Sequence, residues 1–220
     1  MSDKIKNSYK KSKNVYDDVL TQRKWWSRLY IKFFWQGVDD NIVARDLLSW
    51  IDDDFEGEIL DVPVGTAVFT YQKYKAMKRA KITCLDYSED MLSQAEKRFS
   101  ENGVENVKIK QGDVGRLPFE KERFDVVLSM NGFHAFPDKE KAYKEVSRVL
   151  KRGGVFLACF YIRGKSKRSD RLVDRFLSKE GWFTPPFETE FSLRERLEKD
   201  YTVERFETRG SIVLFKAIKK

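Results

Sequence analysis

Apolar residues recur in this chain with two different spacings, and the change between them divides the sequence. Between residues 15 and 35 the sequence is rich in aromatic side chains, and Trp25, Leu29 and Phe33 recur at every fourth position. That spacing places the three side chains on one side of a helix. The pattern therefore predicts a helical N-terminal cap over residues 14–50.

Beyond residue 55, short apolar runs alternate with helical patterns. The run RFDVVLSM is almost wholly apolar in its middle, as expected of a strand buried on both faces. Strands are predicted at 58–62, 81–87, 107–113, 123–130 and 155–161, with helices at 67–80, 88–103 and 137–154. Strands joined by helices of this length form a parallel sheet.

The chain ends in a different pattern. Residues 201–210 and 211–220 are two strand-like runs that meet directly after Gly210, and so close a pair predicts an antiparallel hairpin on one edge of the sheet. A chain of 220 residues suits a single domain. The predicted fold is one α/β domain, residues 1–220, with a Rossmann-like, doubly wound, mostly parallel seven-stranded sheet, the C-terminal hairpin and the N-terminal helical cap.

Composition narrows the class of protein. Hydrophobic residues make up 41% of the chain and charged residues 35%, which is typical of a soluble globular protein. No apolar run approaches the roughly 20 residues that a membrane span requires. Cys84 and Cys159 lie inside apolar runs, and a single histidine, His134, excludes a histidine-rich metal site. We expect a cytoplasmic protein without a metal, with a flexible basic tail at residues 1–13.

The net charge leaves the partner open. The chain carries 43 basic against 35 acidic residues, a net charge of +8. An excess of this size is compatible with nucleic acid, with an anionic membrane surface and with an acidic metabolite.

Polar residues follow the predicted strands at their carboxyl ends. The first strand leads into Asp61 and Gly65, the second into Asp86, the third into Asp113 and the fourth into Asn131. In open parallel sheets ligands bind at this edge. An acid after the second strand can accept hydrogen bonds from both hydroxyls of a ribose, and an acid after the third can accept from the exocyclic amine of adenine. The spacing predicts a site for an adenosine group.

Five segments in this order resemble the class I S-adenosylmethionine-dependent methyltransferases. They are ILDVPVGTA, CLDYSEDML, GDVGRLPF, FDVVLSMNGFHAFPD and VSRVLKRGGVF. The resemblance is strongest to the small-molecule branch that includes quinone-biosynthesis C-methyltransferases, and it covers residues 55–160. It implies S-adenosylmethionine as the methyl donor, S-adenosylhomocysteine as the product, and an N-terminal helical segment over the site.

The resemblance also implies a set of cofactor-binding residues. They are Asp61, Pro63, Gly65, Asp86, Tyr87, Met91, Asp113, Val114, Met130 and Asn131. The family's usual loop is D-x-G-x-G-x-G, and here Pro63 and Ala67 replace its first and third glycines. Proline offers no N–H and fixes its own φ, so we expect weakened or adjusted cofactor binding rather than none. Asp61 has an alternative role, which is to hold the loop through backbone N–H groups.

Two residues are candidates for catalysis. His134 has an ordinary pKa suited to proton transfer near neutral pH, but a lone histidine between two phenylalanines also packs as a structural residue. Tyr16 is the second candidate, because the resemblance implies that a tyrosine in this segment reaches the cofactor.

The acceptor is predicted to be a small molecule that binds beside an insertion, residues 162–198. Basic residues at 163–175 most often mean only a solvated loop and helix. They leave two alternatives open, an anionic acceptor and an RNA substrate that would also use the basic tail. A third alternative is a non-catalytic protein that binds S-adenosylmethionine or a membrane surface, suggested by Pro63 and the aromatic helix. The sequence does not indicate the oligomeric state.

Overall fold

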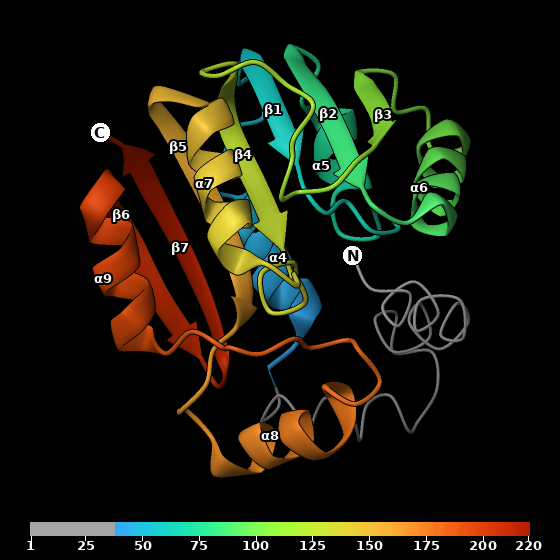
Figure 1. The fold of residues 1–220 in the computed structure, drawn as a ribbon. Coiled ribbons are helices and arrows are strands. Elements are labelled where there is room, and N and C mark those ends of the chain that lie inside the picture. The colour runs from blue at the N-terminus through green and yellow to red at the C-terminus, as the bar shows by residue number, and fades with distance from the viewer. Residues whose placement is uncertain (1–37) are drawn as a thin grey trace.

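One seven-stranded sheet organises the molecule in a computed structural model that describes residues 38–220 (Figure 1). The strand order is β3-β2-β1-β4-β5-β7-β6. The strands are β1 (Gly57–Asp61), β2 (Ala80–Asp86), β3 (Val107–Gln111), β4 (Phe124–Met130), β5 (Leu150–Tyr161), β6 (Tyr201–Arg209) and β7 (Ile212–Lys219). Strands β1 to β5 pair in parallel, and β7 runs antiparallel to both β5 and β6. The predicted Rossmann-like sheet and its C-terminal hairpin are confirmed.

Helices cover both faces of this sheet. They are α4 (Asp40–Leu48), α5 (Tyr71–Ala76), α6 (Glu89–Glu101), α7 (Lys139–Val149), α8 (Lys167–Leu172), the π-helical turn η1 (Val173–Leu177) and α9 (Glu190–Asp200). Helices α7 and α9 pack on one face, in front in Figure 1, and α4, α5 and α6 pack on the other. Two hydrophobic layers separated by the sheet form the core.

Strand β4 shows why the central strands are apolar throughout. Val126 and Leu128 point into the layer under α4 to α6, and Val127 points into the layer under α7 and α9. All three side chains are buried. A polar residue at any of these positions would lose water without gaining a hydrogen-bond partner, so both sides of the strand must be apolar.

The helix after β1 is shorter than the sequence predicts. Residues 67–80 have an amphipathic pattern, but the helix covers only Tyr71–Ala76. Ala67 has a φ of +57°, which is outside the right-handed helical region and costs an L-residue roughly 1–2 kcal/mol. Because the chain turns at this residue, the helix begins after it.

The helix predicted at 137–154 also ends early. It stops at Val149, and Leu150 already pairs with Phe124 of β4 as the first residue of β5. Gly153 and Gly154, at the end of the predicted helix, lie inside this strand at a register shift instead. The predicted tail 1–13, the aromatic helix and Tyr16 lie outside the described residues, so only α4 represents the predicted N-terminal cap.

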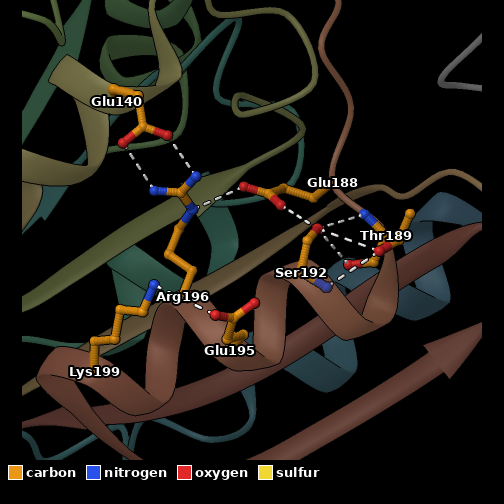
Figure 2. A network of polar contacts seen from close by, with 7 residues as sticks. All are labelled: Glu140, Glu188, Thr189, Ser192, Glu195, Arg196 and Lys199. Carbon is orange, nitrogen blue, oxygen red and sulfur yellow. Dashed lines mark hydrogen bonds and ion pairs between the residues drawn. The ribbon is translucent and has the colours of Figure 1, made fainter.

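A polar network joins α9 to α7 (Figure 2). The Arg196 guanidinium donates to both carboxylate oxygens of Glu140 on α7, one through Nη1 at 3.0 Å and the other through Nη2. Its Nε donates to Glu188 at 2.8 Å. The same guanidinium stacks over the Tyr143 ring at 4.6 Å. A planar guanidinium can serve two carboxylates and an aromatic face at once, so this residue fixes the segment before α9 against the sheet-covering helix α7.

Candidate functional site

A cavity opens at the carboxyl ends of β1, β2 and β4. Strand β1 lies between β2 and β4, so the chain winds in opposite directions on the two sides of this point, where open α/β sheets bind ligands. The lining residues come from the loops after the strands. They are Val62, Pro63, Val64, Gly65, Thr66, Val68, Phe69, Thr70, Leu85, Asp86, Tyr87, Ser88, Met91, Gly112, Asp113, Val114, Met130, Asn131, Ala135, Phe136 and Pro137.

Every predicted cofactor residue except Asp61 lines this cavity. The cavity lining also includes residues that were not singled out from the sequence, such as Thr66 and Phe136 inside the quoted motifs and Phe69 just beyond one of them. Their signal was their position five to eight residues after a strand end. No periodicity marks such loop residues, so they could be found only by treating the whole loop after each strand as cavity lining.

Neighbouring strands hold the loop after β1 in place. The N–H of Val62 donates to the Leu128 carbonyl of β4 at 2.9 Å, and the N–H of Val64 donates to the Leu85 carbonyl of β2 at 3.0 Å. Gly65 then has a φ of +57°, a conformation that glycine adopts at no steric cost. The loop is therefore fixed by strands on both sides although Pro63 offers no N–H of its own.

Pro63 packs against a glycine in the loop after β4. A Cβ placed on Gly132 would lie 2.4 Å from the Cδ of Pro63, which is far inside van der Waals contact. The proline ring thus occupies space that a side chain at 132 would need. The departure from the family's glycine at 63 is accommodated by a second glycine, and the two loops meet at the cavity.

Asp86 connects the loop after β1 to the start of α6. Its Oδ2 accepts from the N–H of Gly65 at 2.9 Å, and its Oδ1 accepts from the N–H of Ser88 at 2.9 Å. The residue is 8% exposed, and burial raises its pKa to about 6, against the lowering effect of these backbone donors. Each carboxylate oxygen retains capacity to accept a further hydrogen bond.

Asp113 lines the cavity beyond β3 and also shapes its own turn. Its Oδ1 accepts from the N–H of Gly115 at 2.8 Å, and its backbone bridges to Arg116. The turn therefore fixes the direction of this carboxylate. Val114, which follows it, is 7% exposed and supplies an apolar wall.

Asn131 begins the loop that closes the cavity next to β4. Its φ is +55°, which asparagine tolerates better than most residues, and its N–H donates to the Cys159 carbonyl at 2.7 Å. This turn brings Met130 and Asn131 to the cavity wall beside the loop after β1.

Asp61 lies beneath the loop rather than on the cavity wall. It is 1% exposed, and its Oδ2 accepts a hydrogen bond from the Tyr74 hydroxyl of α5 at 2.7 Å. Its Oδ1 is buried and makes no hydrogen bond with the described residues. Burial raises the pKa of this carboxyl to about 7, the Tyr74 hydrogen bond lowers it and the charge of Asp86 raises it.

His134 also lies away from the cavity lining. Its ring stacks on Phe183 with centroids 4.1 Å apart, and its Nδ1 accepts from the N–H of Tyr161 at 3.3 Å. Burial, and then the charge of Lys139, lower its pKa to about 3. The packing alternative describes what the ring does in the structure. A catalytic role for His134 stays a prediction.

Lys139, at the start of α7, ties the loop after β4 to the insertion. Its ammonium donates to the Phe136 carbonyl at 3.1 Å and to the Thr184 carbonyl. The Thr184 N–H in turn donates to the His134 carbonyl at 2.9 Å. Burial lowers the pKa of Lys139 to about 8. No sequence pattern indicates this contact, since it joins segments far apart in the chain.

Residues 54–180 match the family model described as methyltransferase domain. This stretch is more than half of the chain and contains the whole cavity lining. The chain belongs to the methyltransferase domain family. The resemblance to class I S-adenosylmethionine-dependent methyltransferases that five sequence segments indicated is confirmed.

Relatives and solved structures agree with the family. The chain is 39% identical over 97 residues to a demethylmenaquinone methyltransferase of Lactococcus lactis, covering 44% of this chain and 38% of the relative. It is 32% identical over 130 residues to a phosphatidylethanolamine N-methyltransferase of Cereibacter sphaeroides, covering 57% of this chain and 63% of the relative. In each case the match spans less than two thirds of the relative. A solved S-adenosylmethionine-dependent methyltransferase of Aquifex aeolicus shares the fold, with a TM-score of 0.64, 18% identity and coverage of 92% and 97%.

The residues around the cavity fit S-adenosylmethionine. Two acids, Asp86 and Asp113, face it among apolar side chains, which suits an adenosine group with its hydroxyls and amine. The unpartnered buried Oδ1 of Asp61 adds a negative group beneath the loop, where a cationic cofactor would be stabilised. Within residues 38–220 no cluster of metal-ligating side chains occurs.

The raised pKa of Asp86 predicts pH-dependent cofactor binding. The pKa of this carboxyl is about 6. At a pH below this value the carboxyl is mostly neutral and accepts hydrogen bonds from hydroxyls less well. We expect the Kd for S-adenosylhomocysteine to rise roughly 10-fold between pH 7 and pH 5, because about one carboxyl in ten stays ionised one unit below its pKa. Calorimetric titration across this range measures the effect.

A matched pair of variants assigns this dependence to one residue. Asp86→Asn should bind weakly with little change between pH 7 and pH 5, whereas Asp113→Asn should keep the pH dependence of the unaltered protein. An equal pH dependence in Asp86→Asn would contradict the assignment.

Proposed function

We propose that this protein transfers the methyl group of S-adenosylmethionine to a small-molecule acceptor by in-line displacement. The observation that carries the proposal is the convergence of the loops after β1, β2, β3 and β4 on one cavity, with acids at the ends of β2 and β3. Membership of the methyltransferase domain family supports the same reaction.

We assign the cofactor's parts to residues as follows. Asp86 accepts hydrogen bonds from the ribose hydroxyls, while Tyr87 and Met91 pack beside the ribose. Asp113 accepts from the adenine amine and Val114 packs on the ring. The loop after β1, with Pro63 and Gly65, and the backbone of Met130 and Asn131 surround the methionine end. Asp61 acts from beneath this loop, through its unpartnered oxygen.

The chemistry asks mainly for alignment. A lone pair of the acceptor forms a bond to the methyl carbon while the carbon–sulfur bond breaks, and its electrons return to sulfur to leave a neutral thioether. Holding the three atoms in line can remove roughly 7–11 kcal/mol from the barrier. The strand-fixed loops around the cavity suit this task. The base role predicted for His134 belongs to acceptors that must lose a proton.

The acceptor class follows from the surroundings of the cavity. Phe69, Phe136 and Pro137 line it beside the methionine end, which favours an acceptor with apolar surface. The two relatives are named for a quinone and a phospholipid, and both molecules carry long apolar chains. Phe183, an aromatic residue of the insertion, packs on His134 in the core and is only 5% exposed. Its side chain is therefore not available to contact an acceptor.

RNA methylation is the second candidate function. Its support is a group of exposed basic residues, including Lys167, Arg168 and Arg171, that form no ion pair with a carboxylate of residues 38–220. RNA binding that falls steeply with salt would favour it. A protein that binds the cofactor without turnover, the third alternative, would show binding but no methyl transfer to quinone, phospholipid or RNA acceptors.

Calorimetric titration of S-adenosylmethionine and S-adenosylhomocysteine tests the proposed cofactor site. We expect micromolar binding, weakened by roughly 30-fold or more in Asp86→Ala, because hydrogen bonds to a charged group contribute about 1.5–3 kcal/mol. Asp52→Ala is the control, since Asp52 is exposed and distant in the chain from every lining residue. Thermal unfolding checks that both variants are folded. Absence of binding to the unaltered protein would overturn the proposal.

A further inference from the structure

The helical segment α8–η1 lies at the same end of the molecule as the cavity. The parallel strands point their carboxyl ends toward it in Figure 1. Ser169, Val173 and Leu177 form its inward side, and all three are buried. Spacings of four residues place these side chains on one side of a helix. The segment is therefore packed by one face only.

Its outward side is basic. The exposed basic residues of this stretch are Lys167, Arg168, Arg171, Arg175 and Lys179. None of them forms an ion pair with a carboxylate in the described part of the chain. Among the acids of this stretch, Asp170 accepts from the Tyr161 hydroxyl at 2.6 Å, and the exposed Asp174 pairs with Arg163. Glu180 is the other exposed acid. The solvent side thus carries an excess of positive charge.

A phenylalanine lies among these basic residues. Phe176 is 60% exposed. With 3.6 residues per turn it would lie only about 60° from Val173 and so beside the buried side. The π-helical turn, in which the Ser178 N–H donates to the Val173 carbonyl at 2.9 Å, widens the helix here. Leu177 is buried and Phe176 is turned to solvent. Such single π-turns are frequent at functional sites.

A second exposed phenylalanine lies at the same end. Phe191, in the first turn of α9, is 77% exposed. Lys165 pairs with Glu190, and the backbone of Arg163 bridges to that of Thr189, so the start of α9 is joined to the chain entering α8. Phe176 and Phe191 are the two most exposed large apolar side chains among residues 38–220.

We propose that the basic–aromatic face, which consists of Arg168, Arg171, Arg175, Phe176 and Lys179, binds the surface of an anionic lipid bilayer. Cations attract acidic headgroups, and an aromatic side chain between them inserts at the boundary of headgroups and acyl chains. Residues 163–181 contain no Asn or Gln, the side chains that pair with the edge of adenine in nucleic acids. The bilayer accounts for the exposed apolar side chains as well as the charge.

The proposal goes beyond the proposed function and does not depend on methyl transfer. Its consequence for that function is geometric, because the cavity and this face lie at the same end of the sheet. A bilayer bound here would lie close to the end of the molecule at which an apolar acceptor enters.

Vesicle co-sedimentation of the full chain tests the proposal. The probes are vesicles of phosphatidylcholine alone and of phosphatidylcholine mixed with phosphatidylglycerol. We expect binding to the anionic vesicles only. The triple variant Arg168→Glu/Arg171→Glu/Arg175→Glu should reduce the partition coefficient on the order of 100-fold, given about 1 kcal/mol for each basic residue near an anionic surface. Phe176→Ala should reduce it roughly 10-fold.

A charge-matched control distinguishes the effect of this face from the effect of the net charge of the protein. Lys78→Glu/Lys108→Glu/Lys144→Glu changes the charge equally at exposed sites elsewhere on the molecule, and it should bind anionic vesicles much more strongly than the triple arginine variant. Equal binding by the two triple variants would overturn the proposal, as would failure of the unaltered protein to bind. Loss of RNA binding in the arginine variant without loss of vesicle binding would instead identify RNA as the partner.

Discussion

Gly132→Ala is expected to lower the free energy of unfolding by about 3 kcal/mol, the upper part of the usual range for inserting a methyl group into a packed site, and to weaken cofactor binding strongly. The added Cβ would lie 2.4 Å from Cδ of Pro63, 2.7 Å from Cζ of Phe136 and 2.9 Å from Oγ of Ser129. The phenylalanine ring can shift. The proline is held by hydrogen bonds of Val62 and Val64 to both flanking strands, so relieving this contact must move the loop that lines the cavity.

Two comparisons make this prediction specific. Gly115→Ala is the matched control, because a Cβ there would meet its nearest neighbour at an ordinary 3.4 Å, and it should leave stability within about 0.5 kcal/mol. The double variant Gly132→Ala/Pro63→Gly should be more stable than the sum of its single changes by about 1 kcal/mol or more. Urea unfolding and titration of S-adenosylhomocysteine measure the two effects. Additive single changes would show that the two residues do not compete for space.

Tyr74→Phe is expected to lower the free energy of unfolding by about 2 kcal/mol at pH 8, the typical loss for a hydrogen bond to a charged group. The Tyr74 hydroxyl is the donor to buried Asp61 at 2.7 Å, and the other oxygen of Asp61 has no hydrogen-bond partner in the described chain. The variant leaves the carboxylate buried with neither oxygen satisfied. Asp61 has a pKa of about 7, so it is mostly charged at pH 8 and mostly neutral at pH 5. The loss should therefore be smaller at pH 5.

The sign of this pH dependence follows from proton uptake. Burial raises the pKa of Asp61 from 3.8 to about 7, so between these values the folded protein holds a proton that the unfolded chain has released. The contribution of Asp61 to stability therefore falls as pH rises through this window. Asp61→Asn should remove that part of the dependence, and Tyr74→Phe should make it steeper. Urea unfolding at pH 5, 6, 7 and 8 measures it.

Tyr143→Phe is the matched control for the tyrosine prediction. Tyr143 is also buried, but its hydroxyl makes no hydrogen bond with the described residues. Removing an unsatisfied buried hydroxyl should leave stability unchanged or raise it slightly. A loss as large as that of Tyr74→Phe would mean that the cost arises from removing any buried hydroxyl, and the role assigned to the Asp61 contact would be wrong.

The sheet could be predicted from sequence because its signals are local. The alternation of apolar runs and helical patterns carries the order of elements, and Gly210 marks the hairpin between β6 and β7. The shortened α5 could not be predicted, because a left-handed Ala67 has no sequence signal of its own. Its conformation results from the loop that the neighbouring strands impose.

The candidate site divides in the same way. Asp86 and Asp113 could be placed because they follow strands directly and a parallel sheet brings strand ends together. The contact of Pro63 with Gly132 and the ties made by Lys139 join segments that only the folded chain brings together. Asp61 shows the limit of motif reasoning most clearly, since its motif position suggests the cofactor while its side chain turns to Tyr74 beneath the loop.

The insertion between β5 and α9 begins and ends at one point on the molecule. The N–H of Arg163 donates to the Glu188 carbonyl at 2.8 Å, and Arg163 bridges to Thr189. A segment whose ends are adjacent can be replaced by another without disturbing the chain on either side. A different segment grafted between residues 163 and 189 would therefore keep the two chain ends in place, but it would have to cover again the core surface on which Val173, Leu177 and Phe183 now pack.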